Sequence, residues 1–120
     1  MTEAVSKLIP VAKASEFPSG TMREIVHQGR RILLARVGDD FFATQARCNH
    51  LGGPLPRGTL EGTVVTCPWH GSQYDLRDGR VLRWTDWSGA ALAFTRLVRP
   101  PRPLVTYKVR RDGDNILVEL

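Results

Sequence analysis

Two cysteine–histidine pairs constrain this chain more than any other feature of its sequence. The segments Cys48-Asn49-His50 and Cys67-Pro68-Trp69-His70 each place a thiol and an imidazole within three residues of each other. Sixteen residues separate the segments, which use both cysteines and two of the three histidines of the 120-residue chain. Because thiolates and imidazoles are common metal ligands, the pairing favours a fold in which two loops converge on one metal centre.

Three interpretations of these pairs compete. In the first, the cysteines are buried as small apolar side chains and the histidines are polar groups with ordinary partners. In the second, all four residues bind structural zinc, although zinc sites commonly group the cysteines in one half and the histidines in the other. In the third, they bind a 2Fe–2S cluster, with both cysteines on one iron and both histidines on the other. The alternating order suits the third, because each of two opposed loops then supplies one ligand to each iron.

The two segments closely resemble the cluster-binding motifs of the Rieske family. The matching stretches are CNHLGGPL at 48–55 and CPWHGSQYD at 67–75, and a looser resemblance extends over the whole chain. The resemblance implies one 2Fe–2S cluster per chain as the cofactor. By the family pattern, one iron is ligated by Cys48 and Cys67, and the other by His50 and His70.

The same resemblance implies roles for residues around the cluster. Backbone amides are expected to approach the sulfides at three glycines, namely Gly52, Gly53 and Gly71. Pro101 lies in a segment, 100–103, that resembles the proline loop covering the cluster in this family.

Two hydroxyl side chains match positions that tune the cluster in respiratory Rieske proteins. There, the hydroxyls at the positions of Ser72 and Tyr74 donate hydrogen bonds to a sulfide and to a ligand cysteine sulfur. Such donors stabilise the more negative, reduced cluster and raise its potential. Ser72 is equally open to interpretation as an ordinary turn residue.

The cysteine count separates two classes within the family. Respiratory Rieske proteins carry a second cysteine pair that cross-links the cluster loops, and it would fall at Gly53 and Trp69 here. Neither position is a cysteine, no apolar run approaches the ~20 residues needed to cross a bilayer, and no secretory signal is visible. We therefore expect a soluble, cytoplasmic protein of the ferredoxin class with no membrane partner.

Short apolar runs between glycine and proline turns predict an all-β fold. We expect an antiparallel Rieske-type sandwich or barrel in a single domain over 1–120, with a two-loop cluster-binding part at about 46–76. The stretch 49–62 contains four glycines and two prolines and is predicted to be a loop without a strand. Strands are expected at 32–37, 41–44 and 63–66, and a terminal hairpin at 105–109 and 116–120.

Residues 84–98 resemble an insertion, because soluble members of the family usually run more directly from the cluster loop to the proline loop. Ser88 is a candidate N-cap for a short helix at 88–97. The apolar side chains of the insertion either form a small satellite core or provide a surface for self-association or for a partner beside the cluster.

The resemblance implies a soluble electron carrier, which passes single electrons from a flavin-dependent reductase to a terminal oxygenase. We expect no enzyme and assign no catalytic residue. Rieske oxygenases add a mononuclear iron held by two histidines and a carboxylate, and only His27 remains once His50 and His70 are assigned. The alternative is a Rieske-like small subunit of a larger reductase, such as nitrite reductase, with a structural or regulatory role. Such subunits frequently lack the ligands, all four of which are present here.

Basic residues are concentrated after the cluster loops. Segment 77–112 contains nine Lys and Arg against three acidic residues, whereas the whole chain has 17 against 12. The basic residues match no known nucleic-acid reader motif, so nucleic acid is not an expected partner. They form either a solvated strand face or a field that steers an acidic redox partner toward the protein.

Overall fold

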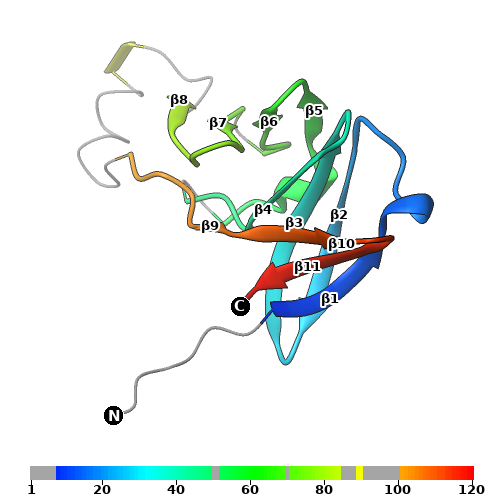
Figure 1. The fold of residues 1–120 in the computed structure, drawn as a ribbon. Coiled ribbons are helices and arrows are strands. Elements are labelled where there is room, and N and C mark those ends of the chain that lie inside the picture. The colour runs from blue at the N-terminus through cyan, green and yellow to red at the C-terminus, as the bar shows by residue number, and fades with distance from the viewer. Residues whose placement is uncertain (1–7, 50–51, 70, 85–88, 91–100) are drawn as a thin grey trace.

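The strands form three antiparallel sheets stacked along the molecule (Figure 1). The computed structural model describes residues 8–49, 52–69, 71–84, 89–90 and 101–120. The first sheet has the order β1 (Leu8–Lys13), β11 (Asn115–Glu119), β10 (Val109–Asp112). The second has the order β2 (Thr21–His27), β3 (Arg30–Val37), β4 (Asp40–Gln45), β9 (Thr106–Tyr107). The third has the order β5 (Thr59–Glu61), β6 (Val64–Thr66), β7 (Gln73–Asp75), β8 (Val81–Arg83). The all-β antiparallel architecture expected from the sequence is confirmed.

Strand β3 separates two hydrophobic cores. Ile32 and Leu34 face a core shared with the first sheet, whereas Leu33 and Ala35 face a core shared with the third sheet. All four side chains are fully buried, because alternate residues of a strand point to opposite faces and both faces are covered here. This explains why the sequence shows a continuous apolar run at β3 rather than an alternating pattern.

The core between the second and third sheets also contains both cysteines. Its buried members include Leu55, Val65, Leu76 and Leu104, together with Tyr74 and Trp84. Trp84, the first residue of the expected insertion, is 2% exposed in this core. The remainder of the insertion lies outside the described residues except for Gly89 and Ala90, which are helical, so most of the helix expected at 88–97 is not described.

Two expectations about strands are wrong. Stretch 49–62 contains a 3-10 turn, η2 (Leu55–Arg57), and β5, which pairs with β6. The three residues of β5 suffice because Leu60 packs against the core while its two neighbours are exposed. The terminal hairpin is formed by β10 and β11 alone, because the chain changes sheets at Lys108 and β9 pairs with β4 instead.

In the part of the chain that the structure describes, no helix is long and apolar enough to span a bilayer.

The short 3-10 turn η1 (Ala14–Glu16) connects β1 to β2 and is tied to the β10–β11 turn by Asp114, which accepts hydrogen bonds from Ser15.

Candidate metal centre

The first cysteine loop, residues 48–53 (loop 1), is closed by backbone hydrogen bonds at its base. The N–H of Cys48 donates to the carbonyl of Gly53 at 2.8 Å, and the N–H of Gly52 donates to the carbonyl of Cys48 at 2.8 Å. Gly52 has a φ of 76°, a left-handed conformation that glycine adopts without strain. Its N–H is directed at a cysteine carbonyl, so in the structure this glycine supplies the reversal that closes the loop.

The second cysteine loop, residues 67–72 (loop 2), repeats this pattern. The N–H of Cys67 donates to the carbonyl of Ser72 at 2.8 Å, and the N–H of Gly71 donates to the carbonyl of Cys67 at 3.2 Å. Gly71 has a φ of 70°. In both loops, therefore, the cysteine bonds the fifth residue after it, and a left-handed glycine at the fourth position bonds back to the cysteine.

The two loops lie close together at Gly53. A Cβ atom on Gly53 would lie 2.5 Å from Sγ of Cys67 and 3.3 Å from the ring of Trp69, a separation that real Cβ atoms do not reach. Gly53 does not have a positive φ, so its lack of a side chain serves the contact between loops rather than the backbone conformation. Cys48 and Cys67 are each 4% exposed and form no disulfide with each other.

Tyr74 reaches from β7 of loop 2's hairpin to the cysteine of loop 1. Its hydroxyl lies 3.2 Å from Sγ of Cys48, within hydrogen-bond distance, and the side chain is fully buried. Burial, reinforced by the hydrogen bond to Cys48, raises the pKa of Tyr74 far above its usual range. The phenol therefore stays protonated and is able to donate to the sulfur.

Ser72 has a different partner from the one that the family resemblance suggests. Its buried hydroxyl donates to the backbone carbonyl of Trp84. A serine hydroxyl has one proton to donate, so in this structure Ser72 fixes loop 2 to the end of β8.

Asn49 and Gln45 connect loop 1 to the segment that follows the prolines. The amide nitrogen of Asn49 donates to the carbonyls of Arg102 (3.0 Å) and Pro103 (2.8 Å), and its amide oxygen accepts from Gln45 at 3.0 Å. The side-chain oxygen of Gln45 in turn accepts the N–H of Val105 at 2.8 Å. The exposed Pro101 adjoins this segment, which is thereby held beside loop 1. Neither amide could be predicted from the sequence, since nothing in the residue types of Gln45 and Asn49 indicates contacts across more than fifty residues.

An exposed arginine supports each loop from outside. Nη1 of Arg47 donates to the carbonyl of Gly52 at 3.1 Å, and Nε of Arg83 donates to the carbonyl of Gly71 at 2.9 Å. The two glycines occupy equivalent positions, so the two guanidiniums are equivalent supports. Nothing in the sequence distinguishes Arg47, and Arg83 is only one of the basic residues of segment 77–112.

The residues present fit a cluster held between the loops. Two thiols on opposed loops belong to the same buried cluster of side chains, and the loops lie so close together that Gly53 has no room for a Cβ beside Sγ of Cys67. The two other expected ligands, His50 and His70, lie outside the described residues. Within the residues that are described, no three His, Cys, Asp or Glu side chains group as a metal site requires.

Comparisons with known proteins agree with this geometry. The model of the Rieske [2Fe-2S] domain matches residues 7–94. The ferredoxin component of biphenyl 2,3-dioxygenase from Rhodococcus jostii (strain RHA1) is 32% identical over 113 residues, which cover 94% of this chain and 92% of that protein.

Solved structures share the fold. The ferredoxin of carbazole 1,9a-dioxygenase from Nocardioides aromaticivorans IC177 superposes with a TM-score of 0.77 at 23% identity, covering 94% of this chain and 97% of that one. A chain from a complex of reduced oxygenase and oxidised ferredoxin in carbazole 1,9a-dioxygenase gives a TM-score of 0.75 at 28% identity, covering 93% and 92%. The chain therefore belongs to the Rieske [2Fe-2S] family, whose cofactor is a 2Fe–2S cluster.

Proposed function

We propose that this chain is the ferredoxin component of an oxygenase system and passes single electrons from a flavin-dependent reductase to a terminal oxygenase. The observation that carries the proposal is the matched pair of loops, which bury two thiols between them. The relatives that match over nearly their full length are named as ferredoxin components of dioxygenases, which supports the same role. Cytoplasmic location and a single domain over 1–120 are part of this proposal.

In the proposed site, Cys48 and Cys67 hold one iron of the cluster, and His50 and His70 hold the other. Held there, a 2Fe–2S cluster would supply one-electron redox chemistry. The protein's own residues do the rest: Gly53 gives the loops room to meet, and Tyr74 keeps a protonated hydroxyl beside Sγ of Cys48. Gly52 and Gly71 close the loops, Ser72 fixes loop 2 to the end of β8, and Pro101 belongs to the segment proposed to cover the cluster.

No step in this role requires a nucleophile or a general base, so we propose no catalytic residue. The relatives named as ferredoxin components of biphenyl dioxygenases are electron-carrier components rather than catalytic ones. The alternative of a regulatory subunit in a larger reductase makes a different prediction for electron flow.

Electron flow through the purified holoprotein tests the proposal. With NADH and the native flavin reductase under anaerobic conditions, the carrier accepts one electron per chain, and adding the native oxygenase with its substrate reoxidises it at a rate that matches product formation. A regulatory subunit would leave product formation unchanged when it is omitted, and that result would contradict the proposal.

A further inference from the structure

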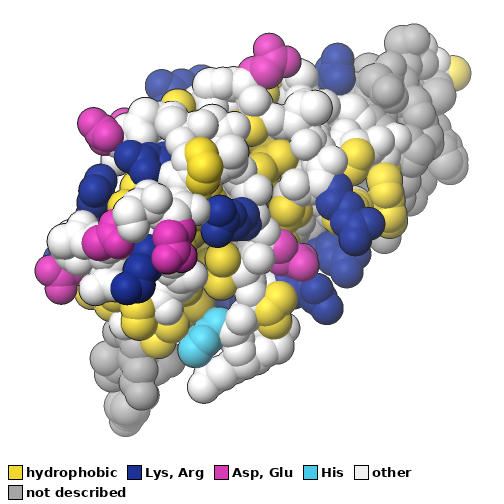
Figure 2. Space-filling view, turned by 90° about the vertical axis from the view of Figure 1, so that its right-hand side faces the viewer, with side chains coloured by type: hydrophobic (Ala, Val, Ile, Leu, Met, Phe, Trp, Pro, Cys, Tyr) yellow, Lys and Arg dark blue, Asp and Glu magenta, His cyan; other side chains and the backbone are white. Residues whose placement is uncertain are grey.

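The two cysteine loops contain no carboxylate, and arginines contact both of them. Neither 41–60 nor 62–74, which contain the two loops, includes an Asp or a Glu. By contrast, Figure 2 shows acidic and basic side chains interspersed on the face that includes η1. Asp75, which follows loop 2, is buried and already paired with Arg77 and Arg80 at 2.7 and 3.3 Å.

Two of the positive charges at this end are held in place. Arg47 and Arg83 each donate one guanidinium N–H to the carbonyl of a loop glycine. A guanidinium has five N–H donors, so each exposed head retains donors beyond the one that it uses for the loop. A fixed guanidinium loses less side-chain entropy when it binds a carboxylate than a freely moving one does.

Trp69 adds an exposed apolar side chain to the same two loops. It belongs to loop 2, is 53% exposed, and its ring lies against the position of Gly53 in loop 1. An exposed aromatic ring on loops that arginines also contact has the composition typical of the centre of protein interfaces.

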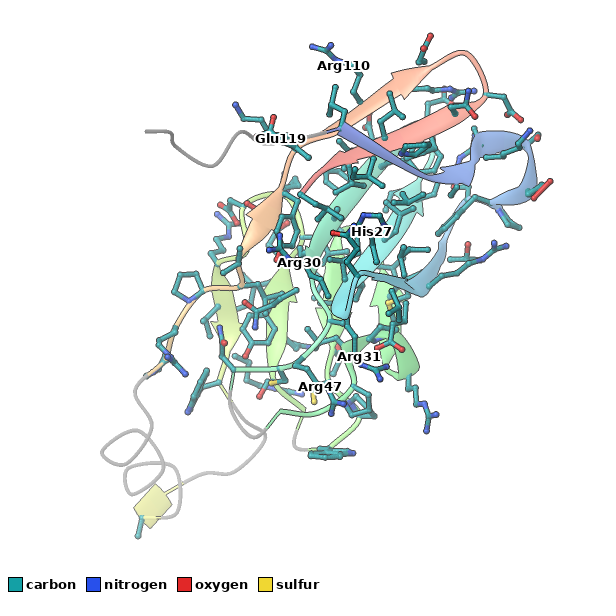
Figure 3. The ribbon with its side chains drawn as sticks, turned by 90° about the horizontal axis from the view of Figure 1, so that it is seen from below. His27, Arg30, Arg31, Arg47, Arg110 and Glu119 are labelled. Carbon is teal, nitrogen blue, oxygen red and sulfur yellow. The ribbon has the colours of Figure 1, made fainter. Side chains whose placement is uncertain are left out.

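We propose that Arg47 and Arg83, with Trp69 between the loops, form a docking surface for a carboxylate-rich face of the protein that exchanges electrons with this chain. The inference rests on the proposed function and gives it a partner chemistry. The charges proposed to attract the partner are therefore not those of segment 77–112 as a whole. Arg83 belongs to that segment, but Arg47 does not. Strand β10, which carries Arg110, lies at the opposite end of the molecule from Arg47 (Figure 3).

Arg110 and Arg111 provide a matched control on β10. Both are exposed, and Nε of Arg111 donates to the carbonyl of Gly113 at 3.1 Å, the same kind of bond that Arg47 and Arg83 make. A double variant Arg110→Gln/Arg111→Gln therefore removes the same charge as Arg47→Gln/Arg83→Gln and one contact of the same type, but on β10.

The electrostatic potential at the loops is measured by the rates at which a small anion and a small cation oxidise the reduced holoprotein. Hexacyanoferrate(III) takes one electron from the protein and becomes hexacyanoferrate(II), and tris(phenanthroline)cobalt(III) likewise becomes the cobalt(II) complex. At low ionic strength, Arg47→Gln/Arg83→Gln should slow the anionic oxidant by about threefold or more, because local charge attraction is little screened there. It should accelerate the cationic oxidant, and the control should match the native protein with both.

Poly-L-glutamate tests the partner chemistry. Binding is followed by tryptophan fluorescence, which requires no electron transfer, so the surface is tested even if the proposed carrier function fails. Binding at low salt should weaken at least tenfold in Arg47→Gln/Arg83→Gln and only slightly in the control, while Arg47→Lys/Arg83→Lys should restore most of it. If the two Gln double variants lost affinity for poly-L-glutamate equally, the proposal would be overturned. Tighter binding of the native protein to a DNA duplex than to poly-L-glutamate of equal charge would also overturn it.

Discussion

The two cysteine loops share one backbone design and one arginine contact each, but the other contacts that hold them differ. In each, a cysteine bonds the residue five positions later, and a left-handed glycine bonds back to the cysteine. Loop 1 is tied by the neutral amides of Gln45 and Asn49 to the segment after the prolines. Loop 2 leads into the buried carboxylate of Asp75, which is held by two arginines. The backbone thus determines where the thiols lie, and the supports determine how each loop responds to pH and substitution.

The strongest way to break the shared design is to separate the loops. Gly53→Ala places a Cβ 2.5 Å from Sγ of Cys67, so the loops must move apart and the protein should lose most of its cluster. The measurement is iron per chain after purification. Gly52→Ala is the control, because it strains the backbone but its Cβ meets nothing within 4 Å. Equal iron content in the two variants would show that the loops do not need this close approach.

Loop 2 should be the acid-sensitive member of the pair. The Arg77 guanidinium holds the pKa of Asp75 well below its usual range. A carboxyl whose pKa is lowered by folding contributes its full stability above its unfolded pKa of about 3.9 and loses it as the pH falls toward the folded value. Asp75→Asn should therefore lower the free energy of unfolding at pH 7 by about 2 kcal/mol, and the two unfolding curves should converge at acid pH.

Denaturant unfolding from pH 7 to pH 2.5 measures this convergence. Asp39→Asn is the control, because Asp39 is 94% exposed and lies 3.6 Å from Arg36, so its loss should change stability by less than about 0.5 kcal/mol. A constant difference between native protein and Asp75→Asn across this range would contradict the assigned ion pairs.

Loop 1 should depend instead on a neutral amide. Asn49→Ala removes the donors to the carbonyls of Arg102 and Pro103. The free energy of unfolding should fall by about 1 kcal/mol, and amide hydrogen exchange in 102–105 should become faster. Because no ionisable group is removed, the loss of stability should be the same at acid and neutral pH. Gln73→Ala is the matched control, since the Gln73 amide donates to Thr66 within loop 2's own hairpin. Unchanged exchange in 102–105 would remove Asn49 from this role.

The hydrogen bond between Tyr74 and Cys48, which joins the two loops, should have the smallest effect on stability and a measurable effect on the midpoint potential of the cluster. Tyr74→Phe removes the hydroxyl 3.2 Å from Sγ of Cys48. If that hydrogen bond favours the reduced state by about 1 kcal/mol, the midpoint potential should fall by about 40 mV for one electron. Tyr107→Phe on β9 serves as the control, and a midpoint that is the same in both variants would exclude Tyr74 from tuning.

The sequence was sufficient for features that depend on local pattern. The apolar run of β3 predicted a buried strand, and the spacing of Cys48, His50, Cys67 and His70 pointed to two converging loops. The sequence was insufficient for very short strands such as β5, which has only three residues and whose pairing depends on the packing of Leu60 against the core. It also missed Asn49 and Arg47, because their partners are carbonyl groups, and every residue type has one.

The switch of sheets at Lys108 shows the same limit at the level of topology. The sequence predicts residues 105–109 as one strand of a terminal hairpin, yet β9 pairs with β4 and β10 pairs with β11. Strand propensity identifies extended backbone, but the partner of each segment is decided by packing across the two cores.

The most direct test of the central claim is the electron paramagnetic resonance spectrum of the dithionite-reduced protein, taken together with its iron and zinc content. A 2Fe–2S cluster held by the two loops predicts two irons per chain, no stoichiometric zinc and a signal from one unpaired electron per chain. A silent spectrum with one zinc per chain would contradict the account and return the four residues to a structural metal site.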